Sequence, residues 1–166
     1  MVNADMPVRL ELEPMSGDEF VVRRAELVED YAQDLASSRG FDGEHARKSS
    51  QELIDGLLPQ GAATPGMLLF TGTAGGERVG WVWLALPRAP ERPDTAWVFN
   101  VYIDAGHRGR GYGRAMMLAA ESELVRRGVP RLGLNVFGDN TPAIRLYESL
   151  GFTVTSQQMA KPLPTG

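Results

Sequence analysis

The chain has 166 residues, of which 43% are hydrophobic, and a formal net charge of −4 at pH 7. This length predicts a single domain over residues 1–166, and the negative balance argues against a general nucleic-acid-binding surface. The absence of cysteine excludes disulfides and thiolate metal sites, and the longest apolar run, Trp81–Leu86, is too short to span a bilayer, so we expect a cytoplasmic protein with no membrane partner and no metal.

In the first half of the chain, apolar residues alternate in some segments and recur at helical spacing in others. One alternating segment predicts a strand that Pro14 closes, and Ser16 with Glu19 predicts a capping box for the helix that follows. Ala74–Glu77, between two apolar runs, predicts a β-hairpin. The predicted elements are a strand over residues 8–14, helices over 16–40 and 42–58, and strands over Met67–Thr73 and Val79–Leu86.

In the second half, an apolar strand runs into a glycine-rich loop that opens a helix. A strand, a helix and a strand in succession favour a parallel pair, whereas the hairpin requires antiparallel pairing. The sequence therefore predicts an α/β fold, of the mixed α+β kind, with a mixed sheet and helices on both faces. The predicted elements are a strand over Trp97–Ile103, a helix to about Arg127, a strand over 132–137, a helix over Asn140–Ser149 and a strand over Phe152–Met159.

The loop Arg108–Gly113 is the most informative segment of the chain. The helix that starts behind it exposes unpaired N–H groups and a partial positive charge, and glycine lets the backbone approach a bound group closely. Arg108, Arg110 and Arg114 add positive charge. Together these features predict a phosphate site. By itself the loop is equally typical of a glycine-rich helix start in an arginine-rich chain.

Two common phosphate-binding patterns do not fit this loop. In the dinucleotide pattern G-x-G-x-x-G the third glycine comes one residue later than Gly113, and no acidic residue ends a second parallel strand about twenty positions on. The P-loop pattern requires a Gly-Lys-Ser/Thr triplet that does not follow here. A nucleotide-binding oxidoreductase of the Rossmann type is therefore disfavoured.

A second segment, residues 140–152, predicts a short helix. Asn140 or Thr141 can cap its start, proline is tolerated in the first turn, and a glycine suits the end. Asn140, Ala143 and Tyr147 lie at i, i+3 and i+7, so they share one helix face.

Both segments resemble motifs of the GCN5-related N-acetyltransferase (GNAT) family. Arg108, Gly111 and Gly113 match its pyrophosphate-loop pattern R-x-x-G-x-G, and residues 140–152 match N-x-x-A-x-x-x-Y-x-x-x-G-F at every named position. The second motif begins 27 residues after Gly113, which leaves room for a helix and a strand as the family requires. The resemblance implies a mixed, mostly antiparallel sheet of six to seven strands in which one parallel pair splays apart.

The family binds acetyl-CoA between the splayed strands, which would be Trp97–Ile103 and residues 132–137 here. One strand would pair with the pantetheine arm, the loop would hold the pyrophosphate, and the short helix would line the arm on its other side. The implied cofactor-binding residues are Val101, Tyr102, Ile103, Arg108, Gly109, Arg110, Gly111, Tyr112, Gly113, Arg114, Asn140, Ala143 and Tyr147. Many members have Pro-Glu where this chain has Ala105 and Gly106, and we expect little loss of binding from that departure.

The reaction implied by the resemblance is direct attack of a primary amine on the thioester. No cysteine exists to carry the acetyl group, and no G-x-S-x-G elbow is present. Tyr147 matches the family residue that protonates the leaving thiolate; the alternative is a tyrosine that only packs the short helix. Asn100 lies mid-strand where many members have a carboxylate. It cannot accept a proton at neutral pH, though it could order a water that relays one.

Acidic residues on the first long helix could attract a cationic acceptor, or could form an ordinary solvated face. The resemblance places this helix near the acceptor, and here it carries Glu26, Glu29, Asp30, Tyr31 and Asp34. For Trp81 and Trp83 we expect core positions, and Tyr102 could line an acceptor pocket or fill core. The prediction is an acetyl-CoA-dependent N-acetyltransferase acting on a small-molecule or peptide amine. The alternative is a non-catalytic acyl-CoA-binding module. The acceptor and the choice between monomer and homodimer stay open.

Overall fold

The structure is a computed structural model that describes residues 8–39 and 42–164. The chain divides into two compact units, Met1–Leu134 and Asn135–Gly166. A single domain over the whole chain stays a prediction. The first unit contains β1 (Glu11–Pro14), α1 (Gly17–Arg39), α2 (Gly43–Leu57), η1 (Gly61–Ala63), β2 (Met67–Ala74), β3 (Glu77–Ala85), β4 (Thr95–Ile103), η2 (Ala105–His107), α3 (Tyr112–Arg126) and β5 (Arg131–Leu134), and the second contains α4 (Thr141–Ser149).

The first unit is built on a sheet with the strand order β1-β2-β3-β4-β5. The first three pairs are antiparallel, and β4 pairs parallel with β5 through the crossover helix α3. Both predicted connections are therefore confirmed. The hairpin between β2 and β3 turns at Gly75 and Gly76, whose φ angles of +61° and +81° suit a two-residue turn.

The prediction of six to seven strands is wrong, because the sheet in the described residues has five. The expected last strand, Phe152–Met159, is missing, and residues 153–164 have no regular secondary structure. A strand requires a neighbour to share its hydrogen bonds. Here the apolar alternation ends after Val154 and a polar Ser-Gln-Gln run follows. Local β-propensity alone did not specify a strand.

Two predicted strands are shorter in the structure than in the sequence pattern. β5 ends at Leu134 rather than at Phe137. Residues 135–137 have no regular secondary structure, and the chain turns at Gly138 and Asp139, where the Asn140 amide donates to the Phe137 carbonyl at 3.0 Å. β1 begins at Glu11, since Val8 is more than a third exposed and has no partner in β2. In both strands the apolar sequence pattern continues past the residues that pair with a neighbouring strand, so it predicted a longer strand than the one that forms.

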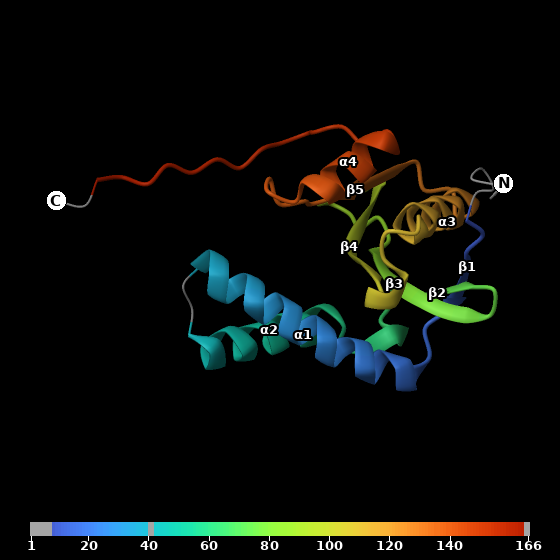
Figure 1. Ribbon diagram of the computed structural model, residues 1–166, viewed down its shortest axis with the longest axis horizontal. Helices are drawn as coiled ribbons and strands as arrows, with labels where there is room; N and C mark the ends of the chain where they lie inside the picture. The colour runs from blue at the N-terminus through green and yellow to red at the C-terminus, as the bar shows by residue number, and fades with distance from the viewer. Residues whose placement is uncertain (1–7, 40–41, 165–166) are drawn as a thin grey trace. The chain divides into compact units, whose positions relative to one another are not determined.

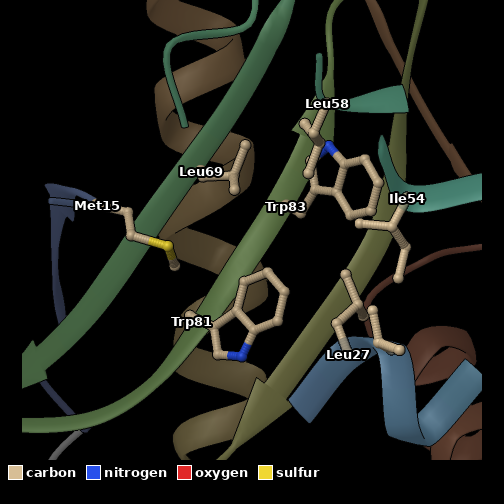
Figure 2. Packing of buried hydrophobic residues seen from close by; sticks show 8 residues of the cluster. Met15, Leu27, Ile54, Leu58, Leu69, Trp81 and Trp83 are labelled. Atoms are coloured by element: carbon tan, nitrogen blue, oxygen red, sulfur yellow. The ribbon is translucent and has the colours of Figure 1, made fainter. Parts of the chain in front are cut away.

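Helices cover both faces of the sheet, as predicted (Figure 1). On one face, α1 and α2 pack side by side and contribute Leu27 and Ile54 to a buried cluster with β3. Figure 2 shows Trp81 and Trp83 projecting from β3 toward these two side chains. Both indoles are almost fully buried, which confirms the prediction that they are core residues.

The opposite face of the sheet is covered by α3. Its buried stripe, Met116, Met117, Ala120 and Leu124, follows helical spacing. Gly72 of β2 leaves the space that Met116 fills, since a Cβ at Gly72 would overlap the methionine methyl carbon. Because α3 packs this tightly, its N-terminal end is fixed against the sheet. No helix in the described part of the chain is long and apolar enough to cross a membrane.

Candidate functional site

The parallel strands β4 and β5 share only part of their length. Pairing runs from Thr95↔Arg131 to Val98↔Leu134, where β5 ends, whereas β4 continues for five more residues to Ile103. On its β5 side, the 99–103 segment therefore has no partner strand in the described residues. Its backbone N–H and C=O groups there can bind an extended ligand in the manner of an added strand. Val101, Tyr102 and Ile103 lie in this segment.

A β-bulge marks the point where β4 leaves β5. The register with β3 passes from Leu84↔Val98 to Trp83↔Asn100, so Phe99 has no direct partner. Its ring instead stacks on Trp83 with centroids 4.7 Å apart. Bulges re-aim side chains and often occur next to active sites. Sequence reasoning missed this feature, because no glycine or proline within β4 signals it.

The bulge determines which face of the sheet carries Asn100. Residues directly opposite each other on antiparallel strands share a face, so Asn100 lies with Trp83, and Tyr102 lies with Trp81, on the α1 and α2 side. Val101 lies on the α3 side with Val82. A ligand along the open edge of β4 would thus meet Asn100 on the side that α1 covers.

The glycine-rich loop joins β4 to α3 through the short η2 helix. Gly109 and Gly111 have φ angles of +71° and +83°, a conformation that other residues rarely adopt. Gly111 is also the N-cap of α3, and no side chain caps the helix start. The first N–H groups of α3 thus lack the usual side-chain acceptor and are suited to bind an anion.

The arginines of the loop differ in how they are held. Arg108 donates from Nε to the Ile103 carbonyl at 2.9 Å and lies over the Tyr102 ring, 5.2 Å from its centroid. Arg110 lies over Tyr112 at 5.6 Å. These contacts place positive charge on both sides of the glycines. Arg114 is exposed in the first turn of α3.

His107 ends η2 and directly precedes the loop. Its ring meets Tyr112 edge-on, with centroids 5.7 Å apart, and its Nε2 lies 3.6 Å from a Glu77 carboxylate oxygen. His45 is exposed on α2 and takes no part in the site. In the described residues no group of three or more histidine, aspartate or glutamate side chains is placed to hold a metal ion.

The remaining predicted site residues lie on α4, in the second unit. Asn140 is the N-cap, and its side-chain oxygen accepts from the Ala143 amide at 3.3 Å. The ring of Tyr147 meets Phe152 edge-on at 5.7 Å, and burial raises the pKa of its hydroxyl above the usual value. The Tyr147 hydroxyl is therefore protonated at physiological pH.

The acidic residues of α1 are not equivalent. Glu26 accepts a hydrogen bond from Arg23 at 3.1 Å, and Glu29 lies 4.0 Å from Arg47. The pKa of Asp30 is raised by partial burial and by the neighbouring Asp34 and Glu26 charges, while Arg108 opposes this effect. Asp30 of α1 thus lies within electrostatic range of Arg108 at the start of the loop.

A match to a family model covers most of the chain. Residues 26–152 match the model described as the acetyltransferase (GNAT) family. The chain belongs to the GNAT family. The predicted resemblance is thereby confirmed, and the match includes both sequence motifs.

Individual relatives agree with this assignment. The uncharacterized N-acetyltransferase YycN of Bacillus subtilis is 30% identical over 92% of this chain and 97% of its own length. The crystal structure of YycN matches with a TM-score of 0.85 over 94% of this chain and 99% of that chain. A shorter match, 46% identical over 36% of this chain and 40% of its own length, is to the [ribosomal protein bS18]-alanine N-acetyltransferase of Escherichia coli. PaiA N-acetyltransferase of Thermoplasma acidophilum in complex with coenzyme A shares the fold, with 16% identity and a TM-score of 0.63 over 90% of this chain and 92% of that chain.

Proposed function

We propose that this GNAT protein is an N-acetyltransferase that moves an acetyl group from acetyl-CoA directly to a primary amine within a ternary complex. The observation that carries the proposal is the β5 side of β4 over residues 99–103, which has no partner strand in the described part of the chain and is followed by an uncapped helix start. CoA contains an extended pantetheine arm and a diphosphate, and each of these two groups has a matching feature in this unit.

The loop residues suit a diphosphate. A Cβ at Gly109 would meet nothing within 4 Å, and the left-handed backbone at Gly111 leaves the amides at the helix start accessible. In this proposal Gly109 to Gly113 donate backbone hydrogen bonds, and Arg108, Arg110 and Arg114 supply countercharge. Tyr112 flanks the same turn. The backbone of Val101, Tyr102 and Ile103 would pair with the pantetheine arm.

By the family resemblance, Asn140, Ala143 and Tyr147 in the second unit would also contact the pantetheine arm. When bound, acetyl-CoA supplies an activated acetyl thioester with a thiol leaving group. Tyr147 would donate its hydroxyl proton to that leaving group, since its raised pKa keeps it protonated. A backbone N–H near the bulge at Phe99 would donate to the carbonyl oxygen.

The acceptor amine must lose a proton before it attacks. Asn100 faces the α1 side and could order a water there, but it cannot itself act as a base. The acidic side chains of α1, above all Asp30, would favour approach of a cationic amine. With no cysteine in the chain, we propose direct transfer rather than a thioester on the protein.

The acceptor is proposed only as a chemical class, a primary amine on a small molecule or a peptide. A relative named for a ribosomal-protein alanine supports an amine acceptor. One observation favours a second candidate, a non-catalytic acyl-CoA-binding module: β4 carries Asn100 and no carboxylate in its open segment.

The test is a panel of amines and peptides incubated with acetyl-CoA. Because the chain has no cysteine, a thiol reagent reports released CoA alone. We expect amine-dependent CoA release, an acetylated product by mass spectrometry, and no acetyl group on the protein when amine is omitted. A stoichiometric acetyl-protein that passes its acetyl group to the amine would contradict direct transfer. Tight CoA binding without turnover of any amine would favour the binding module.

A further inference from the structure

A partly buried ion pair links helix α1 to the residue that leads into the glycine-rich loop Arg108–Gly113, called the cofactor loop below. Arg23 donates two hydrogen bonds to Asp104, from one terminal nitrogen to Oδ1 at 2.8 Å and from the other to Oδ2 at 3.1 Å. The Arg23 side chain is only 11% exposed. Two parallel bonds between a guanidinium and a carboxylate fix relative orientation as well as distance. The two residues are 81 positions apart in the chain, so this contact is purely tertiary.

The other end of this connection is anchored in the sheet. Arg23 Nε lies 3.6 Å from Glu19 Oε1, and the buried Thr71 hydroxyl donates to Glu19 Oε2 at 2.7 Å. Burial lowers the pKa of Arg23, but hydrogen bonds to Asp104 and Glu26 outweigh it and raise the pKa overall. A continuous set of polar contacts therefore runs from β2 through α1 to Asp104. Removing one member would leave a buried charge without its partner.

Asp104 lies where β4 gives way to the loop. Its amide donates to the Val79 carbonyl at 2.9 Å, and its own carbonyl accepts from the His107 amide at 2.8 Å. Arg108 closes the same turn from the other side through its bond to the Ile103 carbonyl. Through the side chain of Asp104, Arg23 of α1 thus holds the backbone that leads to Gly109 and Gly111.

We propose that Arg23 is a positioning residue for the cofactor loop. Its guanidinium group, with two hydrogen bonds, holds Asp104 so that the loop amides are oriented for a diphosphate before the ligand binds. This inference rests on the proposed function, because it assigns the loop to the CoA diphosphate. Preorganised donors bind more tightly than donors that must first be ordered.

The neighbouring residue provides a matched control. Arg24 also forms an ion pair from α1, with its Nε donating to Asp55 at 2.9 Å, but Asp55 lies on α2 and the pair is more exposed. Arg24→Gln removes the same charge from the same helix without touching Asp104. An effect on the loop that Arg23→Gln and Asp104→Asn share, and that Arg24→Gln lacks, belongs to the Asp104 contact.

The experiment measures CoA affinity by calorimetry and amide hydrogen exchange over residues 105–113 in the free protein. For Arg23→Gln and Asp104→Asn we expect about tenfold weaker CoA binding and faster exchange in this segment. The double variant should be little weaker than either single one. Arg23→Lys, which keeps the charge but loses the two parallel hydrogen bonds, should fall between parent and Arg23→Gln. Arg24→Gln should match the parent in both measurements.

Each outcome decides something different. Unchanged CoA affinity and unchanged exchange in Arg23→Gln would overturn the positioning role while leaving the proposed function intact. A parent protein that fails to bind CoA would overturn the proposed function, and the role of Arg23 toward CoA with it. If Asp104→Asn does not fold, Arg23→Lys and Arg23→Gln still decide. A loss of thermal stability equal to that of Arg24→Gln, with no effect on the loop, would mean that the pair is only structural.

Discussion

Two turns of this protein use the same backbone conformation for different purposes. Gly75 and Gly76 of the β2–β3 hairpin and Gly109 and Gly111 of the cofactor loop all have φ between +61° and +83°. In the hairpin, this conformation reverses the chain, and the flanking strands pair with each other in the antiparallel β2–β3 ladder. In the loop, the same conformation at Gly111 leads directly into the start of α3, which no side chain caps. Glycine geometry alone thus does not identify a site; what matters is whether donors remain for a ligand.

The sharpest way to test this contrast is to add the same side chain to each turn. Gly111→Val and Gly76→Val both place valine at a φ near +80°, at a strain cost of about 1–2 kcal/mol each. We expect Gly111→Val to weaken CoA binding by about 100-fold or more, equivalent to about 2.7 kcal/mol, and Gly76→Val to leave it unchanged. Calorimetry with CoA measures both.

The surroundings of Gly111 and Gly76 differ in one respect. A Cβ at Gly111 would lie 3.3 Å from a Val8 methyl carbon, whereas one at Gly76 meets nothing within 4 Å. Gly109→Val, which also meets nothing, separates the loss of binding from that contact. Equal CoA affinity in the loop and hairpin variants would show that the loop glycines serve only the fold.

A second variant separates binding from chemistry. Tyr147→Phe keeps the ring that packs against Phe152 and removes only the proton donor. We expect kcat to fall about 100-fold, at the lower end of general-acid contributions, with CoA affinity nearly unchanged. This is the opposite of the pattern expected for Gly111→Val. Initial-rate kinetics checks it, and an unaltered kcat where chemistry limits the rate would reduce Tyr147 to a packing residue.

Removing an arginine from the loop should weaken CoA binding less than adding a side chain at a loop glycine does. Arg110→Gln removes a loop arginine, while Arg78→Gln removes an exposed one on β3 near the hairpin, 3.8 Å from Glu19. We expect CoA affinity to fall about fivefold for Arg110→Gln and to stay at the parent level for Arg78→Gln. Affinity should also depend less on salt in Arg110→Gln. Identical salt dependence in both variants would argue against a role for Arg110.

The smallest expected effect is a lack of pH dependence. Because burial raises the pKa of Tyr147, its hydroxyl stays protonated above the ordinary tyrosine value of about 10. Loss of the donor should therefore not reduce kcat between about pH 8 and pH 10. A kcat profile of the parent that falls in this range, and loses that fall in Tyr147→Phe, would contradict the raised pKa.

Periodicity and turn chemistry predicted the elements that make their own local contacts. The hairpin glycines, the Ser16 hydroxyl that accepts from the Glu19 amide, and the Asn140 cap all lie as their sequence positions suggest. The strand over Phe152–Met159 failed, because a strand depends on a partner that local sequence does not encode. The capping box is also only half formed, since Glu19 turns to Thr71 and Arg23 instead of its own cap.

The candidate site shows the same division. Its glycines and arginines could be read from spacing, because a helix start imposes local requirements. The bulge at Phe99 and the ion pair between Arg23 and Asp104 could not be predicted from the sequence, since both arise from contacts between different segments of the chain. The roles assigned to Asn100, Tyr147 and the loop residues stay predictions until variants are tested.

The measurement that tests the central claim most directly is a titration of CoA into protein labelled with ¹⁵N at glycine only. The claim is that the amides of the cofactor loop bind the diphosphate and that those of the hairpin do not. We expect large, saturable amide shifts at Gly109, Gly111 and Gly113, and little change at Gly75 and Gly76. Saturable binding that leaves the three loop amides unmoved would contradict the claim.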